Sequence, residues 1–354
     1  MDMKVNQAHA LVSELPKLPE TKTVRRTPLV PYLAQKASES PRFRQSVDAT
    51  IKAIGLPFLG IVLFLALWAT VAPRINTSLG QFPGPMQVYQ QAQRLMDEHF
   101  AERAKAAAFY ERQVQRNAER LAQDPNYDAK IRPYTGKSTF IDQIGTSLYT
   151  VLTGFLLASL IAIPLGILIG LSAGAYAAMN PLIQLFKPVS PLAWLPLVTM
   201  VVSAVYVSND PMFEKSFVNS AITVLLCSLW PTLINTAVGV QSVSKDLQNV
   251  SRVLRLGRLT HIRSIVLPSA VPMIFTGLRL SLGVAWMVLI AAEMLAQNPG
   301  LGKFVWDEFQ NGSSNSLGRI MVAVLVIGLI GFVLDRVMLA IQRRVSWDKT
   351  MTVR

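Results

Sequence analysis

The sequence predicts an all-α integral membrane protein with about six transmembrane helices. Of its 354 residues, 51% are hydrophobic and only 16% are charged, and the mean hydropathy is +0.36. Soluble domains usually carry about 25% charged residues. Several apolar stretches are also long enough to cross a hydrocarbon layer of about 30 Å. The lipid bilayer is therefore the first partner that the composition implies.

The formal net charge of +13 is better explained by membrane topology than by nucleic-acid binding. Basic residues gather in the N-terminal tail, in a loop after residue 244 and at the C-terminal end. Lysine and arginine are retained on the cytoplasmic side of a membrane. We therefore expect both termini and this loop in the cytoplasm, and no nucleic-acid partner. The single cysteine, Cys227, lies among leucines and is assigned no role.

The first 139 residues divide into three parts. Residues 1–52 mix basic residues with prolines and lack helical or strand periodicity, which predicts a mostly disordered cytoplasmic tail. Residues 53–72 have just enough apolar length for the first transmembrane helix. Residues 73–139 are polar and are expected to form a periplasmic helical insert, with one long helix that stops at Asp124-Pro125. We expect a solvated spacer, with contact to a partner protein on that side of the membrane as the alternative.

Residues 140–342 are expected to form the transmembrane core. Its first span, at 140–170, carries small residues at four-residue intervals, among them Ala162, Gly166 and Gly170. Small residues at this spacing allow another helix to approach closely in lipid. We therefore predict a helix-packing stripe there.

The next span is interrupted by prolines. Lys187-Pro188 is followed by Pro191, Trp194 and Pro196. Irregular backbone at membrane depth is tolerated only against protein or a water-filled cavity. We therefore expect Lys187, Trp194 and Pro196 near the transport path.

The last two spans contain charged residues. Arg279 in the fifth span has three possible roles. It pairs with a carbonyl or an acid inside the bundle, it snorkels near the cytoplasmic end of the span, or it joins Lys187 in making the cavity attractive to a small anion. Glu293 is expected to make a structural hydrogen bond near the outer edge. The sixth span, at about 317–341, is followed by a cytoplasmic tail at 343–354, and Asp335-Arg336 can pair locally.

The loop at 244–268 is rich in arginine. No acidic residue interrupts the run from Arg252 through Arg255 and Arg258 to Arg263. The stretch around Arg252 also predicts a short helix with one charged and one apolar side. Such a helix can dock into a groove of a soluble partner. The simpler alternative is a loop that only sets the topology.

Neither glycine-lysine sequence in the chain fits a nucleotide-binding P-loop. Gly136-Lys137 would require a glycine at position 131, which is Ile131, and Lys303 is followed by Phe304. We therefore expect no catalytic residue, no metal site and no bound cofactor in this chain. Energy must come from a partner or from an ion gradient.

Three stretches together resemble the permeases of ABC importers. They read NVSRVLRL, then IVLPSAVPMIFTGLRL with AWMVLIAAEML, and KPVSPLAWLPL. The resemblance covers 140–347 and is closest to the nitrate, nitrite, cyanate and bicarbonate branch, which is related to taurine and sulfonate permeases. The chain departs from the general family pattern, since Asn249-Val250-Ser251 replaces Glu-Ala-Ala and Arg255 replaces the glycine.

The resemblance implies a type I ABC-importer permease fold in a bacterial inner membrane. It also implies a homodimer, two ABC ATPase subunits that bind ATP and Mg, and a periplasmic solute-binding protein. The coupling residues that it implies are Asn249, Val250, Ser251, Arg252, Val253, Leu254, Arg255, Leu256 and Gly257.

Three functions are compatible with these features. The first is an ATP-driven importer subunit for a small inorganic anion, with nitrate or nitrite first and bicarbonate, cyanate, taurine or alkylsulfonates behind. The second is a secondary transporter, although no inverted repeat or pair of acids within the membrane supports it. The third is a membrane enzyme, which no metal cluster, nucleophile elbow or Cys/His pair supports.

Overall fold

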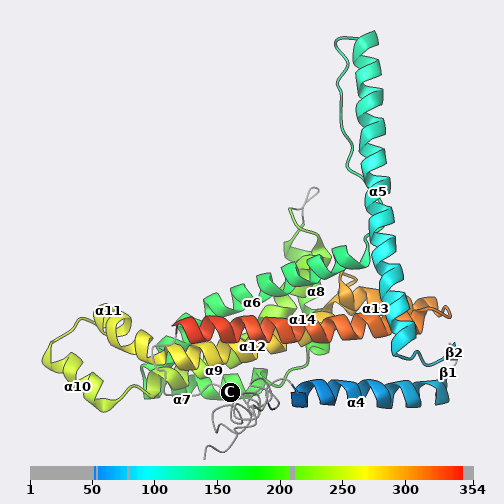
Figure 1. Cartoon of the computed structure of the whole chain (residues 1–354). Coiled ribbons are helices and arrows are strands. Elements are labelled where there is room, and N and C mark those ends of the chain that lie inside the picture. Colours follow the sequence, from blue (N-terminus) through cyan, green and yellow to red (C-terminus); the bar gives the residue numbers. More distant parts are fainter. Residues whose placement is uncertain (1–51, 53–54, 78–79, 208–211, 346–354) are drawn as a thin grey trace, which may run out of the picture. The chain divides into compact units, whose positions relative to one another are not determined.

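The computed structural model describes residues 52, 55–77, 80–207 and 212–345. The expected tail at 1–52 thus lies almost entirely outside the described residues, as do residues 346–354. The chain separates into two units, Met1–Leu67 and Trp68–Arg354. Figure 1 shows the element order in colour.

Helix α4, Leu56–Val71, begins in the first unit and ends in the second. A 3-10 turn, Ala72–Arg74, and a two-stranded antiparallel hairpin of β1, Asn76–Thr77, and β2, Gly80–Gln81, follow. The hairpin leads directly to the long helix of the insert.

Helix α5, Pro85–Gln123, contains 39 residues and is the long helix expected in the insert. Proline at its first position costs no hydrogen bond, because that N–H would lack a helical partner in any case. Its buried side chains include Val88 and Leu95. It packs on α14 and the start of α6 and then runs on beyond them (Figure 1).

The core is a bundle of helices around α9, which contacts α6, α8 and α12. Thr139 caps α6: its hydroxyl accepts a hydrogen bond from the Asp142 N–H, and the Asp142 carboxylate accepts one from the Thr139 N–H at 3.1 Å. The elements of the bundle are α6 Phe140–Gly170, α7 Ala173–Phe186, α8 Pro191–Val205, α9 Lys215–Gln241, α10 Lys245–Val253, α11 Arg258–His261, the π-helical turn Ile262–Val266, α12 Leu267–Ala296, α13 Leu301–Asn311 and α14 Ser316–Val345.

Within the described residues, five helices are long and apolar enough to cross a membrane, and the bent pair α7 and α8 makes up to six. The predicted all-α membrane class is confirmed. One boundary differs from expectation. Helix α5 ends at Gln123, at the predicted stop before Asp124-Pro125, whereas α14 continues to Val345, past the point where a tail was expected to begin.

Candidate functional site

The loop between α9 and α12 is ordered into two short helices, α10 and α11. The Ser244 hydroxyl caps α10 by accepting from the Leu247 N–H at 3.4 Å. The Ser251 hydroxyl and His261 Nδ1, 2.8 Å apart, link α10 to α11. The loop is therefore a structured protrusion at one end of the bundle (Figure 1).

The stretch Asn249–Gly257, expected to contact an ATPase, covers the second half of α10 and the turn after it. Its apolar side chains are exposed at the tip: Val253 is 81% exposed and Leu254 62%, and Leu259 on α11 is 83% exposed. Clustered apolar exposure of this kind marks an interaction surface. We call Val253, Leu254 and Leu259 the apolar tip.

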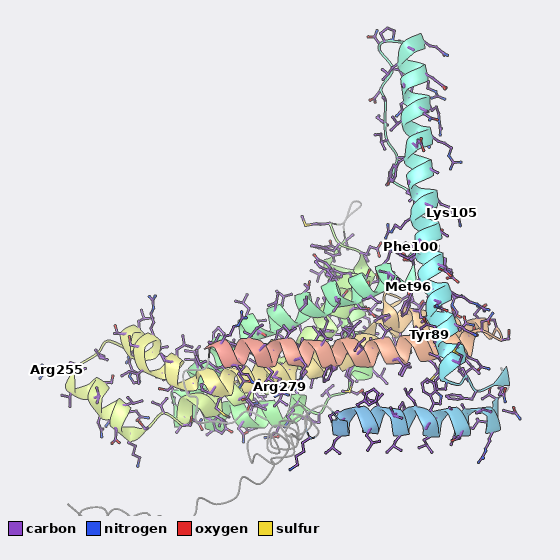
Figure 2. All side chains as sticks on the ribbon, in the orientation of Figure 1. Tyr89, Met96, Phe100, Lys105, Arg255 and Arg279 are labelled. Carbon is purple, nitrogen blue, oxygen red and sulfur yellow. The ribbon has the colours of Figure 1, made fainter. Side chains whose placement is uncertain are left out.

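Arg255 lies at the turn between the two helices and has a φ of +47° (Figure 2). This left-handed conformation costs a residue with a side chain about 1–2 kcal/mol, and glycine adopts it freely. Arg255 stands where the importer-permease pattern has glycine. The turn thus keeps the glycine-type backbone although the glycine is absent.

The proline-rich span is broken, as its sequence indicated. Helices α7 and α8 meet at an angle of 97° across Lys187–Ser190. Lys187 caps the end of α7, and Pro196 lies inside α8. The ring centroids of Trp194 and Phe186 are 6.0 Å apart. The indole Nε1 of Trp194 is buried and has no hydrogen-bond partner in the described part of the chain.

Arg279 on α12 makes two contacts with Asp335 on α14. Its Nε and its Nη2 each donate to one carboxylate oxygen, the latter at 3.0 Å. Arg336 also donates to Asp335, at 2.7 Å, which is the local pair expected from the sequence. Among the described residues, the acid that pairs with Arg279 is Asp335, whose side chain is 33% exposed, and neither Lys187 nor Trp194 makes a polar contact with the Arg279 guanidinium.

The small-residue stripe of α6 faces α9. Ala162 is fully buried. A methyl group added at Gly166 would lie 2.6 Å from the Thr236 Cβ, and one at Gly170 would lie 2.6 Å from the Val240 Cβ. Both distances are far shorter than carbon atoms allow, so larger residues there would force the helices apart.

Glu293 is fully buried, and it makes hydrogen bonds of the structural kind that the sequence predicted. Its carboxylate accepts hydrogen bonds from the Ser147 hydroxyl at 2.8 Å and from the Gly302 N–H at 3.0 Å. It therefore joins α12 to α6 and to the start of α13, where the helix dipole favours a negative charge.

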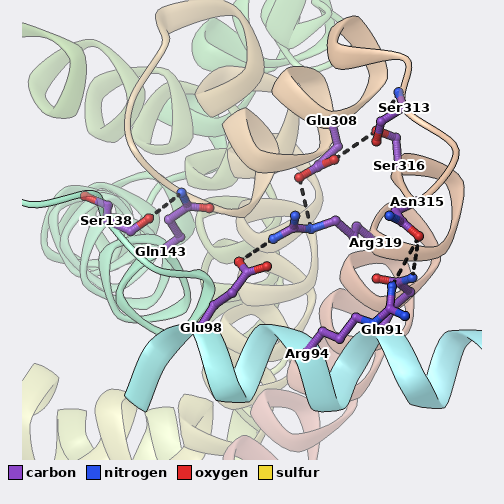
Figure 3. A network of polar contacts seen from close by, with 10 residues as sticks. All are labelled: Gln91, Arg94, Glu98, Ser138, Gln143, Glu308, Ser313, Asn315, Ser316 and Arg319. Carbon is purple, nitrogen blue, oxygen red and sulfur yellow. Dashed lines mark hydrogen bonds and ion pairs between the residues drawn. The ribbon is translucent and has the colours of Figure 1, made fainter. Parts of the chain in front are cut away.

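Sequence reasoning missed one cluster, at the base of α5 (Figure 3). Arg319 of α14 pairs with Glu98 of α5, and its Nε lies 3.1 Å from the Glu308 Oε1 of α13. Glu308 in turn accepts from the Ser316 hydroxyl at 3.0 Å. The only signal in the sequence was a basic residue, Arg319, near the start of an apolar span.

No group of three metal-ligating side chains occurs in the part of the chain that the structure describes. The candidate site consists of a protruding loop, a broken span and an ion pair between two spans.

Comparisons with known proteins agree with this architecture. The nitrate import permease NrtB of Leptolyngbya laminosa is 37% identical over 63% of this chain and 77% of its own length. The bicarbonate transport system permease CmpB of Synechococcus elongatus is 32% identical over 85% of this chain and 91% of its own. The NrtB of Synechocystis is 38% identical over 55% of this chain and 66% of its own.

A family model supplies the assignment. Residues 162–347, from the middle of α6 to beyond the end of α14, match the model described as "binding-protein-dependent transport system inner membrane component". The matched region includes the broken span, the protruding loop and the Arg279–Asp335 pair. The chain therefore belongs to this family of membrane permeases.

Proposed function

We propose that this permease carries a small inorganic anion, nitrate or nitrite first, into the cell. The support is its similarity to nitrate and bicarbonate import permeases over more than half of the chain. Bicarbonate is the nearest alternative, followed by taurine and other sulfonates. In this family ATP is hydrolysed by partner subunits, so ATP and Mg belong to those partners.

We further propose the orientation that the charge rule favours, with both termini and the α10–α11 loop in the cytoplasm. The insert at 73–139 then lies on the periplasmic side. There it acts as a spacer or as a contact for the solute-binding protein. Cysteine labelling at Ser264, which is exposed beside α11, by a membrane-impermeant reagent tests the orientation. Labelling in intact cells would reject it.

The permease works, in this proposal, as a homodimer with two ATPase subunits. The apolar tip enters a groove of each ATPase, and the surrounding arginines set its orientation. Closure of the ATPases on ATP then moves α10 and α11 and shifts the spans between inward-open and outward-open states as rigid bodies. Both features needed for docking, exposed apolar side chains and unopposed positive charge, occur at the tip.

The transport path, in this proposal, follows the broken span. Lys187 makes no ion pair among the described residues, so its positive charge is free to attract an anion. Arg279 contributes only when its pair with Asp335 opens, because the carboxylate offsets its charge in the present arrangement.

One experiment tests the function directly. The permease is reconstituted in vesicles with its ATPase and binding protein, and uptake of nitrate, nitrite, bicarbonate and taurine is measured with and without ATP. ATP-dependent uptake of one inorganic anion is expected. Equal uptake when ATP is withheld would instead support a gradient-driven secondary transporter.

A further inference from the structure

A cavity of about 640 Å³ lies beside the α10–α11 loop. It is bounded by the ends of α6 and α9, the start of α7, the two short helices and the π-helical turn before α12. Its polar lining includes Gln241, Gln248, Ser251, Arg252, Arg258 and His261. No carboxylate lines it, and none of the three apolar-tip residues does.

The cavity is electropositive. Arg252 and Arg258 line it, and neither makes an ion pair with any described residue. Ser251 is only 6% exposed, and its hydroxyl is hydrogen-bonded to Nδ1 of His261. The Nε2 atom of His261 is therefore available to bind a ligand. Two guanidinium groups, an imidazole and two amide side chains therefore offer donors to one space.

The size of the cavity argues for a ligand larger than a transported inorganic ion. Its volume of about 640 Å³ is in the range of sites for organic ligands, about 300–1,000 Å³. A water molecule occupies about 30 Å³ in the liquid, and an ion of four atoms is not much larger. Such an ion would leave most of the space empty.

The position of the cavity indicates the chemistry. Gly170 and Gln241, which line it, are the last residues of the membrane-crossing helices α6 and α9. The cavity is therefore at the depth where a bilayer has its phosphate headgroups. Its lining also includes apolar side chains such as Leu171 and Val243, which can contact a glycerol or acyl portion.

We propose that this cavity binds a phosphate-bearing organic anion, presented either by the headgroup of an anionic phospholipid or by a small soluble phosphate ester. Arg252 and Arg258 hold the phosphate, since guanidinium groups bind phosphate oxygens through paired N–H donors. Basic pockets at the cytoplasmic ends of transmembrane helices bind anionic headgroups on the same principle. The occupant connects α6 and α9 to the loop and so stabilises the loop.

The test compares Arg258→Gln and Arg252→Gln with Arg263→Gln, in the purified, delipidated full-length chain. Arg263 is a matched control, because it is an exposed arginine of the same loop that does not line the cavity. Native mass spectrometry measures retention of added phosphatidylglycerol, with phosphatidylcholine as the zwitterionic reference. Calorimetry measures binding of glycerol 3-phosphate. Thermal melting verifies that each variant is folded.

Each cavity variant is expected to weaken binding about tenfold, and Arg263→Gln less than twofold. Loss in the phosphatidylglycerol arm assigns the ligand to the membrane, and loss in the glycerol 3-phosphate arm assigns it to the cytosol. Gln241→Trp, which fills the cavity without changing its charge, should reduce binding similarly and serves if an arginine variant misfolds. The proposal is overturned if the wild type binds neither ligand, or if cavity and control variants bind equally well.

Discussion

Asp335→Asn is expected to destabilise the protein more than Arg279→Met, although the two changes break the same ion pair. Asp335 pairs with two guanidinium groups, those of Arg279 and Arg336, whereas Asp335 is the one ion-pair partner of Arg279 among the described residues. Removing the carboxylate leaves Arg279 unpaired within a membrane span. Removing Arg279 leaves Asp335 still paired with Arg336.

The expected magnitudes follow from burial. The side chains of Arg279 and Asp335 are 26% and 33% exposed. An exposed pair contributes at most about 1 kcal/mol, and removing one partner of a fully buried pair costs about 3–5 kcal/mol. For this half-buried pair we expect a loss of about 2 kcal/mol for Asp335→Asn and about 1 kcal/mol for Arg279→Met.

Unfolding by sodium dodecyl sulfate in mixed micelles measures these free energies. Arg336→Met is the matched control, because Arg336 contacts the same carboxylate from a side chain that is 50% exposed. The double variant of Arg279→Met with Asp335→Asn should lose less than the sum of the single losses. If Asp335→Asn is no more destabilising than Arg336→Met, the inference that Asp335 pairs with both arginines while Arg279 depends on Asp335 is wrong. Arg279→Met should also lower the uptake measured in transport assays, if Arg279 lies on the transport path.

Three further predictions concern the loop, the bundle and the insert. Arg255→Gly should preserve ATP-driven uptake better than Arg255→Val, because valine is strained at a φ of +47°. Arg255→Glu and Arg252→Glu should both allow ATP hydrolysis without uptake. Normal uptake by both charge-reversed variants would reject docking of the loop to the ATPase. Gly166→Leu should reduce the yield of folded protein, because the leucine would collide with α9. Gly145→Leu on the same helix should leave the yield unchanged, because a side chain at that position meets open space. Equal yields of the two variants would contradict the close contact between α6 and α9. The Tyr134 hydroxyl donates to the Glu102 carboxylate at 2.7 Å, which raises the pKa of Tyr134 and lowers the pKa of Glu102. This contact therefore stabilises the insert at pH values between the lowered pKa of Glu102 and the raised pKa of Tyr134. The stabilisation is lost as the pH rises through the pKa of Tyr134, and also as the pH falls through the pKa of Glu102. The ionisation of Tyr134 can be followed by its ultraviolet absorbance as the pH is raised, after subtraction of the curve of the Tyr134→Phe variant. In the Glu102→Gln variant the midpoint of this curve should move to lower pH. An unchanged midpoint would refute the contact.

Much of the fold could be predicted because its signals are local. The span expected at 140–170 has those same bounds in the structure, since apolar length and a capping threonine define it. The break in the next span follows from prolines, which remove backbone donors and disfavour helix in the residue before them. The unusual backbone of Arg255 could also have been anticipated, because the family pattern has glycine there.

Contacts between distant segments could not be predicted in the same way. Arg279 finds its partner 56 residues later, and Arg319 pairs with Glu98, 221 residues earlier. Several acids and carbonyls could satisfy an arginine in a bundle, and the choice depends on how the helices are rotated against one another. Periodicity within a single helix carries no such information. The cavity beside the loop was missed for the same reason, since six separate elements enclose it.

Helix α14 has Arg319 near one end and Asp335 sixteen positions further along, a separation of about 24 Å in an α-helix. Near its start the helix is attached to the insert through Glu98, and further along it binds Arg279. An α-helix is stiff along its axis, so a force applied to α5 would be transmitted along α14 to the contact between Asp335 and Arg279. The insert and an ion pair between two spans are thus connected through one helix.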